Sequence, residues 1–208
     1  MIRIVGLSAT LPNYVDVADF LGVSRQSGLF YFDSSFRPIP LEQHFLGIKG
    51  KNGSQQARRN LDRVTFEKVR SLVEGGHQVM VFVHARKETV KTALALKEAA
   101  VAEGAIDDFK CETNPGFEFF RREVGTSKNK EMKQLFEDGF GIHHAGMLRS
   151  DRNLMEKAFD AKMIKVSLTR SNVCCIKLYY CRFCVVRQHW PGVSTCQHMQ
   201  VSSIIIYG

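Results

Sequence analysis

The order of apolar and polar residues predicts a chain that alternates strands with helices. Five consecutive apolar residues, Val79 to Val83, indicate a strand buried on both faces of a parallel sheet, and a helix with one apolar face follows over 90–101. A shorter apolar run over 2–7 predicts a second buried strand, and a helix is expected from Asn13 to Gly22. Because strands that alternate with amphipathic helices build parallel sheets, the pattern predicts an α/β fold.

The rest of the chain contains weaker signals. Pro38 and Pro40 exclude a helix from the segment 34–47, which is expected to be an extended connector. The segment 107–128 has no clear pattern. Five further elements are predicted: a helix over 56–73, a helix over 130–136, a strand over 140–143, a helix capped by Ser150 and a strand that begins over 163–166.

Length and composition exclude several classes of protein. The chain has 208 residues, 44% of them hydrophobic and 24% charged, which is enough for a packed core and rules out a disordered chain or a disulfide miniprotein. No apolar run is long enough to span a membrane, and the start lacks a signal-peptide pattern, so no membrane partner and a nuclear or cytoplasmic location are expected. With 29 basic and 21 acidic side chains the formal charge is +8, which favours a polyanionic partner.

The composition changes abruptly at residue 166. From there to residue 208 the chain has no Asp or Glu, four basic residues, five of its six cysteines and its only tryptophan. Such a shift indicates a boundary and an irregular tail. Four potential zinc ligands lie in this tail, namely Cys181, Cys184, Cys196 and His198, although the single residue between the last two is an unusual spacing.

Three polar clusters follow predicted strands, and they are the candidate functional residues. They are Ser8-Ala9-Thr10, the segment 84–87 and the segment 143–146. Each could be a strand-to-helix turn that needs small or capping residues. Because ligands of open α/β sheets bind beyond the carboxyl ends of the strands, three such clusters in a basic protein favour a phosphate-rich ligand. The adjacent His143 and His144 have no third metal ligand nearby, so no metal site is predicted there.

Four segments together resemble a known family in order and spacing. They are Gly6-Leu7-Ser8-Ala9-Thr10-Leu11-Pro12-Asn13, then Phe32-Asp33 with 36–41, then 81–88, and 141–147. This set is similar to the superfamily 2 helicases of the Ski-two-like group, and most of all to the members of that group that have two helicase cassettes. The resemblance covers Met1 to about Lys165.

The resemblance implies a fold, a function and roles for individual residues. It implies the end of one RecA-like domain over 1–33, a connector over 34–53 and an incomplete second RecA-like domain over 54–165. The full family members are ATP-dependent helicases that use ATP and magnesium and act on RNA or DNA. Their partners are other subunits of coactivator, repair, ribosome-rescue or spliceosomal complexes. By resemblance, Ser8 and Thr10 couple hydrolysis to unwinding, and nucleic acid is contacted by Phe82, His84, Arg86, Lys87, His143, His144 and Gly146.

Other family motifs are missing from the sequence. It contains no Gly-x-x-x-x-Gly-Lys-Ser/Thr loop to hold ATP phosphates, and no acidic motif precedes Ser8 to hold magnesium. The arginine-finger helix is also absent. The chain is therefore expected to be a helicase fragment that neither binds ATP and magnesium tightly nor hydrolyses ATP alone. A non-catalytic basic nucleic-acid-binding module and an inert truncation product are the alternatives.

The codons that can encode residues 166–208 suggest a reason for the unusual composition of this tail. Codons for Val166-Ser167 can match a splice donor, and codons for Cys181-Arg182 can contain a splice acceptor. Read in another frame, the codons after Cys181 can encode the family's missing Thr-Ala-Thr and Trp-Gly-Val-Asn-Leu-Pro segment. We hypothesise that 166–181 translates an intron and that the rest of the tail is an exon out of frame. Sequencing the transcript and the gene across codons 165–182 tests this, and a gene without those splice signals would refute it.

Overall fold

The computed structural model describes residues 4–8, 11–36, 41–49, 54–83, 85–170, 183–186 and 199–207. The chain divides into two compact units, Met1–Pro40 and Leu41–Gly208, and each is considered by itself. The division falls inside the predicted connector over 34–53. The domain boundaries inferred from the sequence, at residues 33, 53 and 165, stay predictions.

The first unit is small and mostly irregular. Helix α1 (Tyr14–Phe20) forms within the helix predicted from Asn13 to Gly22, and a 3-10 turn, η1, spans Ser34–Phe36. The strand predicted over 2–7 is wrong for its described part, because 4–8 has no regular secondary structure. A strand needs a neighbour for its backbone hydrogen bonds, and the described residues of this unit contain no other strand. Ile4, Val5 and Leu7 are consequently exposed.

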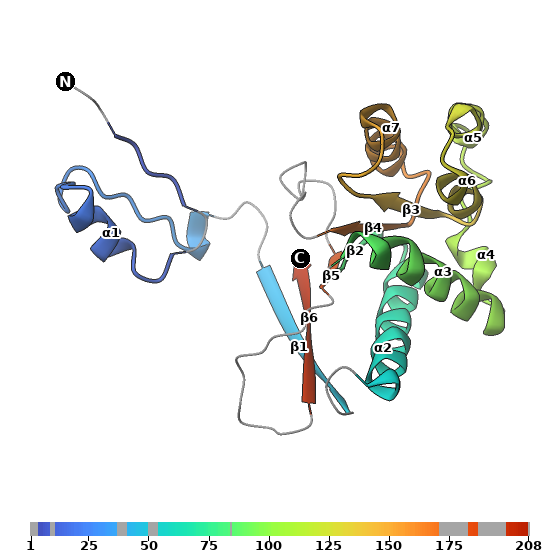
Figure 1. Cartoon of the computed structure of the whole chain (residues 1–208), viewed down its shortest axis with the longest axis horizontal. Helices are drawn as coiled ribbons and strands as arrows, with labels where there is room; N and C mark the ends of the chain where they lie inside the picture. The colour runs from blue at the N-terminus through green and yellow to red at the C-terminus, as the bar shows by residue number, and fades with distance from the viewer. Residues whose placement is uncertain are drawn as a thin grey trace. The chain divides into compact units, whose positions relative to one another are not determined.

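The second unit contains a mixed sheet with the strand order β1-β6-β5-β2-β4-β3 (Figure 1). Strands β2, β3, β4 and β5 run parallel, whereas β6 is antiparallel to β1 and β5. The carboxyl ends of the parallel strands therefore lie at one edge of the sheet. The strands are β1 (Leu41–Lys49), β2 (Val79–Val83), β3 (Phe140–His143), β4 (Val166–Arg170), β5 (Phe183–Val186) and β6 (Met199–Tyr207).

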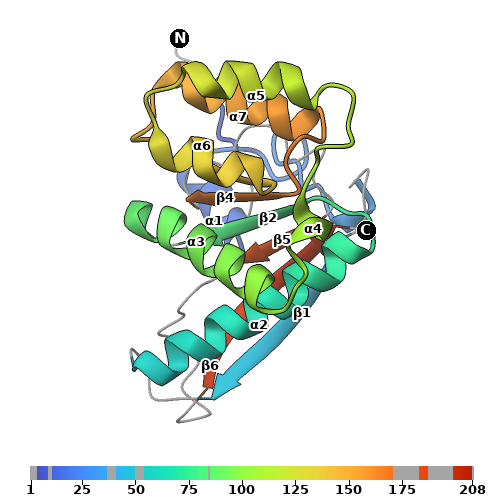
Figure 2. The same ribbon diagram turned by 90° about the vertical axis from the view of Figure 1, so that its right-hand side faces the viewer.

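Helices pack against this sheet in two groups. Helices α2 and α3 lie side by side and contact its central strands, while α6 and α7 contact β3 and α5 packs against both of them (Figure 2). This arrangement confirms the predicted α/β fold with a parallel sheet flanked by helices. The bounds are α2 (Gln55–Glu74), α3 (Arg86–Ala102), α4 (Ile106–Phe109), α5 (Phe117–Thr126), α6 (Lys130–Glu137) and α7 (Arg149–Asp160).

No helix in the described ranges combines the length and the apolar character that crossing a membrane requires.

The core holds the helices to the sheet through stacked aromatic rings. Phe109 lies between Phe66 and Phe140, with ring centroids 6.4 Å and 5.1 Å apart, and none of the three is more than 2% exposed. Burial of aromatic rings of this size contributes a large share of the hydrophobic stabilisation of a small domain. The Gln78 side chain adds a polar link, because its amide donates to the carbonyls of Phe159 and Ile164 at 2.7 Å each.

Several elements differ from the sequence expectations. The patternless segment 107–128 contains most of α4 and all of α5. Ser150 is not the cap of α7, because the backbone turns into the helix at Leu148 and Ser150 lies in its first turn. Strand β4 begins at Val166, at the end of the segment 163–166 where a strand was predicted to begin, and it pairs with a neighbour on each side. Strands β5 and β6 form within the segment expected to be an irregular tail.

Candidate nucleic-acid interface

Two of the predicted polar clusters lie at the same edge of the sheet. The segment 84–87 follows the carboxyl end of β2, and α3 begins within it at Arg86. The segment 143–146 follows the carboxyl end of β3. Strand β4 lies between the two, with Arg170 in register with Val83 and Thr169 in register with His143. The topology therefore brings together two motifs that are far apart in the sequence.

A direct contact joins the two clusters. The Arg86 guanidinium donates a long hydrogen bond of 3.4 Å to the carbonyl oxygen of Gly146, which is 60 positions away. Both residues are exposed, as is the neighbouring Lys87. The edge thus presents two cationic side chains beside an exposed glycine turn, and such groups suit the oxygens of a phosphate backbone.

Helix α7 holds the imidazole ring of His143 in place through Glu156. The Nε2 atom of this ring lies 2.8 Å from a carboxylate oxygen of Glu156, and the ring is largely buried, with 8% of the residue exposed. Because a carboxylate only accepts hydrogen bonds, Nε2 carries the proton in this pair. The interaction fixes the ring orientation at the end of β3, and we interpret it as support for the turn that follows.

His144 is also buried, and its surroundings favour the neutral ring. Its Nδ1 accepts a hydrogen bond of 3.2 Å from the backbone N–H of Gly146, which leaves Nε2 as the protonated nitrogen. Burial lowers the pKa of His144 below its usual value of 6.5, and the positive charge of Arg86 lowers it further. Of the other nearby groups, His143 acts in the same direction and Glu131 opposes it.

We therefore expect acid to destabilise the fold through His144. Its pKa is lower in the folded than in the unfolded state, so as the pH falls below 6.5 the unfolded chain takes up a proton first. The stabilisation is complete above pH 6.5 and is lost as the pH falls through the folded-state pKa. Urea unfolding at pH values of about 7.5 and about 5.5, on either side of the histidine's ordinary pKa, measures this. His144→Asn is the comparison because it keeps an acceptor but does not titrate. An equal loss of stability in both proteins would contradict the assignment.

The other predicted site residues lie in different surroundings. Phe82 is only 7% exposed and packs in the hydrophobic core, so its ring does not face the solvent. Ser8 is exposed in the first unit. Thr10 and His84 lie outside the described residues. The roles that the resemblance assigns to all of these residues stay predictions.

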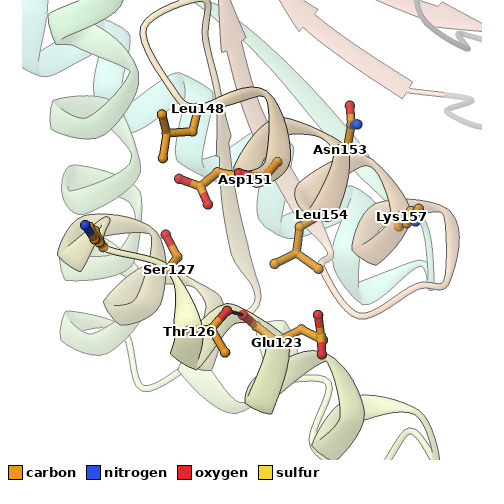
Figure 3. A pocket seen from close by; sticks show the side chains of 10 residues that line it. Glu123, Thr126, Ser127, Leu148, Asp151, Asn153, Leu154 and Lys157 are labelled. Carbon is orange, nitrogen blue, oxygen red and sulfur yellow. Dashed lines mark hydrogen bonds between the residues drawn. The ribbon is translucent and has the colours of Figure 1, made fainter.

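A pocket of about 510 Å³ lies between the carboxyl end of α5 and the amino end of α7. Figure 3 shows Asp151 and Leu148 on one side and Ser127 and Thr126 on the other. Two carboxylates and two ammonium groups line it, so its charge is balanced and selects neither cations nor anions. The lining residues are Glu123, Thr126, Ser127, Lys128, Leu148, Ser150, Asp151, Asn153, Leu154 and Lys157.

Within the part of the chain that the structure describes, no three His, Cys, Asp or Glu side chains are grouped so that they could bind a metal ion. Three of the possible zinc ligands in the tail, Cys181, Cys196 and His198, lie outside the described residues. The fourth, Cys184, lies in strand β5. The zinc alternative stays a prediction.

Sequence reasoning missed two residues of this edge. Glu156 follows His143 by 13 positions and no local motif marks it, because only the packing of α7 on β3 brings the two together. Thr169 lies in register with His143 because β4 inserts between β2 and β3. Neither position could be found from spacing along the chain.

Comparisons with known proteins extend over most of the chain. A helicase of budding yeast, the RQC trigger complex helicase SLH1, is 55% identical over 166 residues, which is 80% of this chain and 8% of that protein. Subunit 3 of the rat activating signal cointegrator 1 complex is 56% identical over the same share. The Arabidopsis DExH-box ATP-dependent RNA helicase DExH14 is 51% identical over 168 residues. The chain spans 8% of the length of each, and no family model matches it.

Proposed function

Since this chain belongs to the Ski-two-like group of superfamily 2 helicases, we propose that its second unit forms part of the surface that binds nucleic acid during ATP-dependent unwinding. The observation that supports this proposal is the contact between Arg86 and Gly146, because it joins the ends of β2 and β3 into one exposed surface. Single-stranded RNA is the proposed ligand. One relative is named an ATP-dependent RNA helicase, which favours RNA over DNA.

We also propose that these 208 residues do not hydrolyse ATP by themselves. Phosphates of ATP are held by a glycine-rich loop between a strand and a helix. In this structure β2 is followed by a segment with Ala85, Arg86 and Lys87, and β3 by a turn with a single glycine, Gly146. The residues at these two strand ends therefore do not fit the triphosphate of ATP.

The larger assembly is part of the proposal. The yeast relative is named for the RQC trigger complex and the mammalian relatives for a signal cointegrator complex. By analogy, we propose that the protein acts with other subunits of such a complex, in the nucleus or the cytoplasm.

Binding of labelled single-stranded RNA, followed by fluorescence anisotropy over a range of salt concentrations, tests the proposal. If two phosphates are contacted, we expect the logarithm of the binding constant to fall with the logarithm of the salt concentration, with a slope of about −1.4. Binding that is absent, or that does not depend on salt, would contradict the proposed interface. Phosphate release measured with ATP and RNA should not exceed the buffer rate, and RNA-stimulated release would refute the proposed lack of hydrolysis.

A further inference from the structure

Gly146 is not required for the conformation of its backbone. The described glycines with positive φ are Gly22, Gly76, Gly104 and Gly139, and Gly146 is not among them. A residue with a side chain could therefore adopt the same backbone angles without strain. Any requirement for a glycine at this position must therefore come from the space around it and not from its backbone angles.

The space beside Gly146 is already occupied. A Cβ atom added to Gly146 would overlap the guanidinium carbon and both terminal nitrogens of Arg86. The same guanidinium donates to the Gly146 carbonyl at 3.4 Å. The planar cation thus lies against the bare Cα of the turn.

We propose that Gly146 is a glycine because the guanidinium of Arg86 fills the place of its side chain, so that Gly146 positions Arg86 at the strand ends. The expected effect of Gly146 on RNA affinity rests on the RNA-binding function proposed above. The proposal differs from the ordinary explanation, in which a glycine lets the nucleic acid approach the backbone closely. Gly146 is a positioning residue, and Arg86 is the residue that contacts phosphate.

The guanidinium of Arg86 can contact Gly146 and a phosphate group at the same time. A guanidinium has five N–H donors, and the structure uses one of them for the Gly146 carbonyl. The remaining donors are available to phosphate oxygens from an exposed side chain. Because the guanidinium is the end of a flexible side chain, adding a methyl group to Gly146 should displace Arg86 rather than unfold the turn.

A double-mutant cycle in the full chain tests the proposal through RNA affinity. We expect Gly146→Ala to weaken binding of single-stranded RNA about fivefold, the effect of losing one hydrogen bond of ordinary strength, because a displaced guanidinium keeps its charge near the phosphate. In the Arg86→Ala background the same substitution should change the affinity less than about twofold, since no guanidinium is left to displace. If Gly146→Ala weakens binding equally in both backgrounds, the glycine serves close approach of the nucleic acid and the proposal is overturned.

A second measurement needs no RNA and separates failure of this proposal from failure of the proposed function. NMR titration of the His144 ring should show a higher pKa in Gly146→Ala than in the wild type, because the positive charge of Arg86 moves away. Arg86→Ala should raise this pKa as well, and the double variant should raise it no further than Arg86→Ala does. An unchanged His144 titration in Gly146→Ala would overturn the proposal even if the wild type binds RNA.

The matched control is Gly125→Ala on α5. A Cβ atom at Gly125 meets no other atom within 4 Å, so this variant adds a methyl group to an exposed glycine without a steric consequence. We expect neither the RNA affinity nor the His144 titration to change.

Discussion

Replacing Arg86 and Lys87 together by glutamine is expected to weaken binding of single-stranded RNA at least about tenfold. Both side chains are exposed at the start of α3, beside the turn that follows β3. Each lost cation removes a charge-assisted contact to phosphate, and the salt slope should become smaller by about 1.4 for the pair. Fluorescence anisotropy titrations at several salt concentrations measure both effects.

The matched control removes the same charge elsewhere. Lys157 and Lys162 are exposed at the carboxyl end of α7 and just beyond it, where the chain returns toward the start of β4. Changing both to glutamine leaves the net charge equal to that of the first variant. We expect only a small loss of affinity in the control. Equal losses in the two variants would show that RNA responds to net charge and not to this edge of the sheet.

Replacing Gly139 by alanine is expected to destabilise the second unit by about 3 kcal/mol or more. Gly139 has a φ of +80° between α6 and β3, which is strained for any residue with a side chain. In addition, an added Cβ would overlap the backbone carbonyl of Phe109, whose ring is buried between Phe66 and Phe140. Neither the backbone at Gly139 nor the backbone at Phe109 can move without disturbing the core. Urea unfolding, followed by circular dichroism, measures the loss.

Gly104 provides the control for the backbone contribution. Its φ is +67°, but a Cβ there meets nothing within 4 Å, so Gly104→Ala should cost only about 1 kcal/mol. The difference between the two variants isolates the overlap with Phe109. Equal destabilisation by the two variants would show that the backbone carbonyl of Phe109 moves away at little cost. The tight packing of Phe109 against Gly139 would then be contradicted.

The strongest local patterns predicted the central elements correctly. Strand β2 matches the five apolar residues from Val79 to Val83, and β3 matches the strand predicted over 140–143. Helix α5 was not predicted, although Phe117, Phe120 and Val124 have helical spacing. Its N-cap is Gly116, which makes no side-chain capping hydrogen bond, so the usual sequence signal of a helix start is missing. The strand predicted over 2–7 failed because apolar character alone does not supply a neighbouring strand.

The sequence predicted the motifs of the candidate site, but it did not predict how their residues lie in space. The resemblance to Ski-two-like helicases is confirmed by relatives that are 51–56% identical over 80% of the chain. The contact between Arg86 and Gly146 depends on strand order and spans 60 positions, so no spacing rule reveals it. The burial of His143 and His144 likewise follows from the packing of the turn and was not visible in two adjacent polar residues.

Photo-cross-linking of single-stranded RNA that contains 4-thiouridine, with the adducts mapped by mass spectrometry, tests the central claim most directly. We expect adducts on 85–87 at the start of α3 and on 144–148 after β3, and their loss when Arg86 and Lys87 are both changed to glutamine. Adducts confined to other surfaces, such as α2 or the acidic segment 107–112, would contradict the claim that the ends of β2 and β3 form the nucleic-acid interface.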